Sequence, residues 1–198
     1  ILGDHYVNMT LENIEAGDPV AVYKSGSNWG SAFGITLNNL YVGIKSFIFG
    51  VFGGIGTGLV LLFNGIMVGA FQFFFYKEGV LWESVRGIWI HGSMEIFAII
   101  IEGAAGLILG ASILFPRTYS RLTSFKIGVK DGVKILISTF PFTIVAGLLE
   151  GYVTRYSNAM PNWLSVGIIL ITLSIISYYY LIYPRLVHKK LKQTYAVI

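Results

Sequence analysis

The sequence contains no cysteine and little charge. Of its 198 residues, 12% are Asp, Glu, Lys or Arg, whereas 55% are hydrophobic and the mean hydropathy is +0.70. The absence of cysteine excludes disulfides, thiolate metal ligands and cysteine nucleophiles. Soluble domains carry about 25% charged residues, so this composition indicates a membrane protein.

Four long stretches lack Asp, Glu, Lys and Arg altogether. They are residues 46–76, 103–116, 135–149 and 156–184. A helix that crosses the hydrocarbon core needs about 20 mostly apolar residues. We therefore expect an all-α fold, a polytopic bundle of about five transmembrane helices in this chain. The first two are expected to meet near Asn64 and Gly65, and one long tilted helix is the alternative.

The charged and polar residues divide the chain into three parts. Residues 1–38 form a polar, slightly acidic segment, residues 39–184 form the transmembrane domain, and residues 185–198 form a basic tail. Within the domain, the later spans are expected at about 87–114, 133–150 and 163–183.

Lys and Arg are distributed unevenly between the connecting segments. Residues 115–134 hold five of them and the tail holds four, against two in 77–86 and one in 151–162. Cytoplasmic loops are enriched in Lys and Arg, so we expect a cell (inner) membrane protein with its C-terminus in the cytoplasm and residues 1–38 outside. The same distribution explains the formal net charge of +4 without a nucleic-acid partner. The basic cytoplasmic loop includes Arg117, Arg121 and Lys126.

One predicted span carries three ionisable residues. His91, Glu95 and Glu102 lie at about 0°, 40° and 20° around a helix that turns about 100° per residue, which makes one narrow stripe. A charge at mid-bilayer costs roughly 2.5–3.5 kcal/mol on insertion scales, so the stripe is expected to face protein or water. Its functional interpretation is a proton relay, an ion site or a metal site. Its structural interpretation, which we prefer, is a hydrogen-bonded cluster that fixes helix packing.

Small residues and amides mark the expected helix contacts. Small residues let helix backbones approach closely, and amides in spans hydrogen-bond to neighbouring helices. The expected helix-packing glycines are Gly50, Gly54, Gly58, Gly65, Gly69, Gly103, Gly106 and Gly110. The polar amides in spans are Asn38, Asn39 and Asn64. A pore lined by the glycines of 50–69 is the alternative to tight packing.

The chain offers few patterns that indicate catalysis. The segment "HGSME" lacks the second His of H-E-x-x-H, and no G-x-S-x-G occurs. We therefore expect no catalytic residue, no cofactor and no assigned metal ligand, with an intramembrane hydrolase using Glu95 or Glu102 as the weaker alternative. Glu150 and Arg155 are expected to form an ion pair at the outer end of the fourth span.

Five segments in a fixed order carry a family resemblance. They are "NN" at 38–39, "GIGTGLVLLFNGIMVGAF" at 54–71, "HGSMEIFAIIIEGAAGLILG" at 91–110, "FPRTYSRL" at 115–122 and "LLEGYVTR" at 148–155. Through their combination, the chain resembles the stage II sporulation protein M family of prokaryotic membrane proteins. The resemblance implies a multi-pass protein of the cytoplasmic membrane with no established catalytic activity and no known active-site residues to carry over.

The same resemblance implies a role among cell-envelope proteins. In spore formers, the family's namesake helps to assemble a complex with peptidoglycan-degrading partners during engulfment. The segment at 3–26 resembles relatives that do not sporulate and that usually carry further sequence upstream. The chain also starts at Ile1 rather than Met, so we expect a fragment or a processed form.

Two functions remain open from the sequence. The leading hypothesis is a non-enzymatic scaffold in the lipid bilayer that self-associates or organises envelope (peptidoglycan-remodelling) proteins. The second is a transporter or channel in which Glu95 and Glu102 bind protons or cations at mid-depth.

Overall fold

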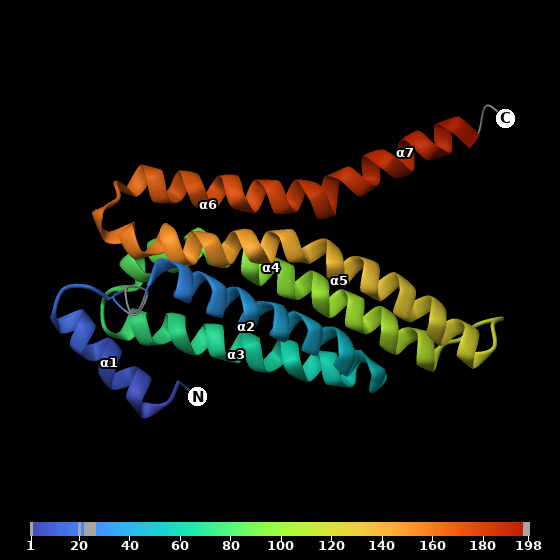
Figure 1. Cartoon of the computed structure of the whole chain (residues 1–198), viewed down its shortest axis with the longest axis horizontal. Coiled ribbons are helices and arrows are strands. Elements are labelled where there is room, and N and C mark those ends of the chain that lie inside the picture. Colours follow the sequence, from blue (N-terminus) through green and yellow to red (C-terminus); the bar gives the residue numbers. More distant parts are fainter. Residues whose placement is uncertain (1, 20, 22–26, 196–198) are drawn as a thin grey trace.

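The computed structural model describes residues 2–19, 21 and 27–195, and within this part of the chain every regular element is a helix (Figure 1). The α-helices are α1 (Asp4–Glu15), α2 (Asn28–Ile48), α3 (Ile55–Lys77), α4 (Leu81–Leu114), α5 (Arg121–Tyr152), α6 (Asn162–Ser177) and α7 (Tyr183–Tyr195). Short 3-10 or π turns connect some of them, namely η2 (Phe49–Val51), η3 (Thr154–Ala159) and η4 (Tyr178–Ile182).

The helices run up and down beside one another, as Figure 1 shows. Four of them are long and apolar enough to cross a membrane: α3, α4, α5 and the continuous stretch Asn162–Thr194. Helix α2, with 21 residues, runs beside these spans and packs against α4 and α5, but it includes more polar positions and is not one of the four. The prediction of an all-α transmembrane bundle with about five spans is confirmed.

The junction between the first two spans was predicted at the wrong place. Helix α3 continues without a break through Asn64 and Gly65, and the Asn64 side chain donates to the Val60 carbonyl at 2.7 Å within the same helix. The chain instead turns between α2 and α3, where Gly53 and Gly54 have φ values of +67° and +85°. Only glycine adopts such angles without strain. Helix α2 begins at Asn28, ahead of the boundary placed at residue 38.

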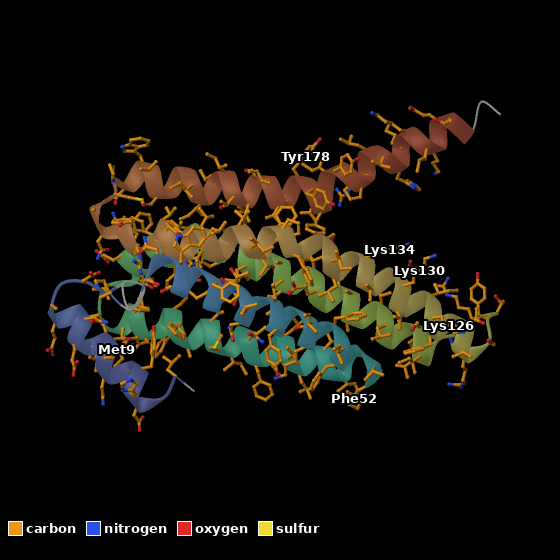
Figure 2. All side chains as sticks on the ribbon, viewed as in Figure 1. Met9, Phe52, Lys126, Lys130, Lys134 and Tyr178 are labelled. Atoms are coloured by element: carbon orange, nitrogen blue, oxygen red, sulfur yellow. The ribbon has the colours of Figure 1, made fainter. Side chains whose placement is uncertain are left out.

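Helix α5 begins earlier than the fourth span was expected to begin. Ser120 caps its first turn by accepting a hydrogen bond from the Thr123 backbone N–H at 3.2 Å. Lys126, Lys130 and Lys134 recur every fourth residue, so a helix places them on one side. Figure 2 shows these three lysines along the end of α5 that lies next to the α4–α5 turn. Much of the expected basic loop is therefore helical.

Glycines hold α4 against the corner between α2 and α3. A Cβ at Gly106 would collide with the Thr57 hydroxyl and the Ser46 carbonyl, and one at Gly110 would collide with the backbone of Gly53 and Gly54. Thr57 donates to that Ser46 carbonyl at 2.7 Å, which ties α3 to α2. Close approach of backbones through small residues is the packing mode typical of membrane helices.

Helix α6 lies on the far side of α4 and α5 from α2 and α3 (Figure 1). It contacts α4 through Ser93 and Thr172, whose hydroxyl oxygens are 2.7 Å apart. Helix α7 carries the basic tail and diverges from the bundle at the end that also holds the α4–α5 turn. The two segments richest in Lys and Arg thus lie at the same end of the molecule, as a single membrane orientation requires.

Candidate functional site

The ionisable stripe of α4 faces the interior of the bundle. His91 and Glu102 are 4% and 2% exposed, and Glu95 is partly buried. Along the helix axis, Glu95 lies about 4 Å from the midpoint of α4. Because α4 has 34 residues, or about 51 Å, the stripe lies deep between the helix ends.

Glu102 sits at the contact between α2, α4 and α5. Its Oε1 accepts a hydrogen bond from Thr139 Oγ1 of α5 at 2.7 Å. On the other side, α2 approaches so closely at Gly43 that a Cβ there would collide with the Glu102 carboxyl group. This carboxyl is thus held by a specific donor and by a close backbone approach.

His91 is placed between a hydroxyl and a carboxyl group. Its Nδ1 lies 2.9 Å from Thr154 Oγ1, in the η3 turn after α5. Its Nε2 lies 3.6 Å from Glu150 Oε2, near the end of α5. Glu150 is 8% exposed, so an acidic group and an imidazole from two helices meet in the interior.

Glu95 joins this pair to make a cluster of three. His91, Glu95 and Glu150 each offer one ligand atom, and these atoms all lie within 4.8 Å of one another. Among the described residues, neither carboxyl forms an ion pair with Lys or Arg. The cluster therefore brings two acidic groups close together, and no Lys or Arg in the described part of the chain pairs with either of them.

Two cavities border the stripe. The larger, about 460 Å³, lies between α2, α3, α4 and α5 and is lined by all three cluster residues as well as Gln72 and Trp89. The smaller, about 320 Å³, is lined by Glu95 and Glu102. Four residues belong to both walls, namely Asn38, Asn39, Met67 and Glu95. The lining residues from Ile88 to Glu102 cover about 21 Å of α4.

All three predicted amides line these cavities. Asn64 lines the smaller one while donating to its own helix. Asn38 Nδ2 lies 3.5 Å from Asn39 Oδ1. The buried Asn39 side chain interacts with the Glu95 carboxyl group as a hydrogen-bond donor. Buried amide donors are usually satisfied in this way.

The comparison with known families settles which group of proteins the sequence comes from. Residues 3–155 match the family described as Stage II sporulation protein M. The chain belongs to the stage II sporulation protein M family. No curated protein and no solved structure gives a significant match. The matched region includes α4, α5 and both cavities of this family member.

The other residues predicted from the sequence are packing glycines and basic residues. Some of these glycines contact residues of another helix, and others do not. Gly50 and Gly103 make close contacts, Gly50 with the Gly106 backbone and Gly103 with Leu61. Gly54, near Leu107, is at the α2–α3 corner. Nothing lies within 4 Å of the Cβ position at three α3 glycines, namely Gly58, Gly65 and Gly69. The basic residues Arg117, Arg121 and Lys126 lie in the α4–α5 turn and the start of α5, at one end of the bundle.

Glu150 and Arg155, the residues of the expected outer ion pair, each contact another residue in the structure. Glu150 turns inward to His91, while Arg155 donates to the Asn28 side chain at the start of α2. The chain leaves α5 for the η3 turn between these two residues.

The sequence did not predict three polar residues that contact the stripe. They are Thr139, Thr154 and Glu150, whose side chain lies beside His91. Each is a small or acidic polar residue in or next to α5 that meets the stripe only when α4 and α5 are packed together. The one available signal was Glu150 itself, because it directly follows an uncharged stretch of the sequence.

Proposed function

We propose that this family member is a non-enzymatic membrane transporter or channel that binds a cation in the cavities beside α4. The observation that supports this most is the position of Glu95, which belongs to the walls of both cavities near the middle of a spanning helix. Ionisable residues inside membranes mark ion pathways when they face a bundle interior or a water-filled cavity.

The arrangement of the carboxyl groups fits a cation. Glu95, Glu102 and Glu150 approach the cavities from two helices, and the described residues bring no Lys or Arg to pair with them there. Buried carboxylates are strongly destabilised without a partner. A bound cation supplies that partner, and the amides of α2 and α3 supply further oxygen ligands along the cavity walls.

Reconstitution into liposomes tests the proposal. Protein-containing vesicles are expected to take up a cation under an imposed membrane potential, and Glu102→Gln is expected to lower the rate to that of protein-free vesicles. Glu83→Gln is the matched control, because Glu83 lies in the first turn of the same helix and borders neither cavity. Equal rates with and without the protein would overturn the proposal.

A scaffold that associates through α3 is the second candidate. It is supported by the open α3 glycines Gly58, Gly65 and Gly69, which have no described residue within 4 Å of their Cβ positions, and by the family membership. Such glycines allow close approach of a further helix, from a second copy or from an envelope protein. Gly65→Leu is then expected to reduce self-association in a crosslinking assay without unfolding the monomer, and an unchanged crosslinking pattern would speak against this candidate.

The proposed membrane orientation is based on the distribution of Lys and Arg. We propose a cell-membrane location with the α4–α5 turn and the C-terminus in the cytoplasm and residues 1–38 outside. The common location of the two basic segments at one end of the bundle supports this orientation.

A further inference from the structure

The geometry points to a binding site for a divalent transition-metal cation formed by His91, Glu95 and Glu150. This inference rests on the proposed function, because it takes a cation as the occupant of the larger cavity. It adds the chemical class of that cation and the atoms that hold it.

The three side chains come from two helices and converge on one point. One ligand atom of each lies within 4.8 Å of the other two. Two ligand atoms of a tetrahedral Zn²⁺ lie about 3.4 Å apart, given metal–ligand bonds of about 2.0–2.2 Å. The Nε2 of His91 and the Oε2 of Glu150 are 3.6 Å apart. This pair is already spaced as two ligands of one ion, whereas Glu95, within 4.8 Å of both, must approach them by at most about 1.4 Å.

His91 has a hydrogen-bond partner at its second ring nitrogen, as metal-binding histidines do. A ligating imidazole almost always makes a hydrogen bond through its second ring nitrogen, which fixes the orientation of the ring. In this chain, Nδ1 of His91 lies 2.9 Å from the buried hydroxyl of Thr154. The Nε2 atom is thereby directed toward Glu150 and the cavity.

The ligand types select the class of metal. Mg²⁺ and Ca²⁺ prefer sites made wholly of oxygen ligands. One imidazole with two carboxylates suits Zn²⁺, Mn²⁺ or Fe²⁺ instead. Two carboxylates also balance the charge of a divalent cation in an interior that no Lys or Arg of the described residues neutralises.

The site keeps room for a further ligand. All three side chains line the cavity of about 460 Å³, whose wall also includes Asn39 and Gln72. Three protein ligands beside a cavity leave a coordination position for water or for an exchanging ligand. Such an incomplete shell suits a metal that is taken up and released better than a closed structural site does.

Equilibrium dialysis of the detergent-solubilised full chain with Zn²⁺ tests the site, with bound metal measured by mass spectrometry. About one Zn²⁺ per chain is expected. His91→Ala and Glu150→Gln are each expected to weaken binding more than about 100-fold, and Thr154→Val about tenfold, because it only orients the ring. The matched controls are His188→Ala, in exposed α7, and Glu83→Gln, and both are expected to keep the wild-type affinity.

Two further measurements make the outcome decisive. Circular dichroism and gel filtration identify variants that fail to fold, and the visible spectrum of bound Co²⁺ reports loss of the imidazole ligand in folded His91→Ala. No saturable Zn²⁺ binding, or equal affinity in the wild type, His91→Ala and Glu150→Gln, would overturn the site. Zn²⁺ binding without cation uptake by vesicles would keep the site and overturn the transport function. Cation uptake without Zn²⁺ binding would keep the transport function and overturn the site.

Discussion

Thr139 of α5 donates a hydrogen bond of 2.7 Å to Glu102 of α4 in a part of the bundle where both residues are buried. This contact connects α4, the longest α-helix, to α5, the helix with which α4 shares its largest interface. It also fixes one end of the row of carboxyl groups beside the cavities.

Replacing Thr139 by Val removes that donor while keeping the shape of the side chain. Interhelical hydrogen bonds in membrane proteins contribute about 0.6 kcal/mol on average and up to about 1.7 kcal/mol. We expect Thr139→Val to lower the free energy of unfolding by about this amount in a detergent unfolding titration. Thr118→Val, in the exposed α4–α5 turn, is the control. A destabilisation equal to that of the control would show that the hydrogen bond contributes nothing.

Gly43 defines how closely α2 approaches Glu102. Because a Cβ there collides with the carboxyl group, Gly43→Ala is expected to displace that group from Thr139 and to slow cation uptake by proteoliposomes. Gly58→Ala places the same methyl group on α3 where nothing lies within 4 Å, and is expected to leave the rate unchanged. If both variants transport at the wild-type rate, the position of the Glu102 carboxyl is irrelevant to transport.

Gly106 and Gly65 are expected to respond differently to the same substitution. A side chain at Gly106 meets the Thr57 hydroxyl and the Ser46 carbonyl, so Gly106→Leu forces the α2–α3 corner away from α4. Overpacking typically costs about 1–3 kcal/mol and occasionally more, and we expect at least this loss with reduced abundance in the membrane. Gly65→Leu meets open space and is expected to keep the monomer folded. Similar loss of stability in both would contradict the packing described for α4.

The direction of the ionisable stripe could be predicted from the sequence, whereas its partners could not. The spacing of His91, Glu95 and Glu102 follows the helical period, and the cost of exposing charge to lipid leaves only protein or water to face. Thr154 and Glu150 reach His91 only through the packing of α4 and α5. In that packing Gly128 of α5 lies against Ser112 of α4 and Gly132 lies near the Ala105 carbonyl, and no local sequence pattern specifies which residues meet.

The α2–α3 turn shows a second limit of sequence reasoning. Asn64-Gly65 is a typical turn dipeptide, but within a helix Asn64 satisfies its amide by donating to Val60. Gly53-Gly54 lies in a longer apolar stretch, where surrounding residues favour a span. The positive φ angles at these two glycines become visible only when the chain is folded. The number of spans was therefore easier to predict than their boundaries.

The membrane orientation can be tested because the chain has no cysteine of its own. Tyr119→Cys, in the α4–α5 turn, is expected to react with a membrane-impermeant thiol reagent only after the inner side of the membrane is made accessible. Glu78→Cys, in the exposed turn between α3 and α4, is expected to react in intact cells. The unmodified chain is the control and should not react. The opposite labelling pattern would reverse the proposed topology.

We propose that Glu95 binds a cation where the two cavities share their walls. The most direct test compares cation uptake by vesicles that contain equal amounts of the wild-type chain, Glu95→Gln or Glu83→Gln. Uptake in the wild type and in Glu83→Gln, with Glu95→Gln reduced to the level of protein-free vesicles, is the predicted result. Uptake by Glu95→Gln at the wild-type rate, or none by the wild type, would contradict the claim.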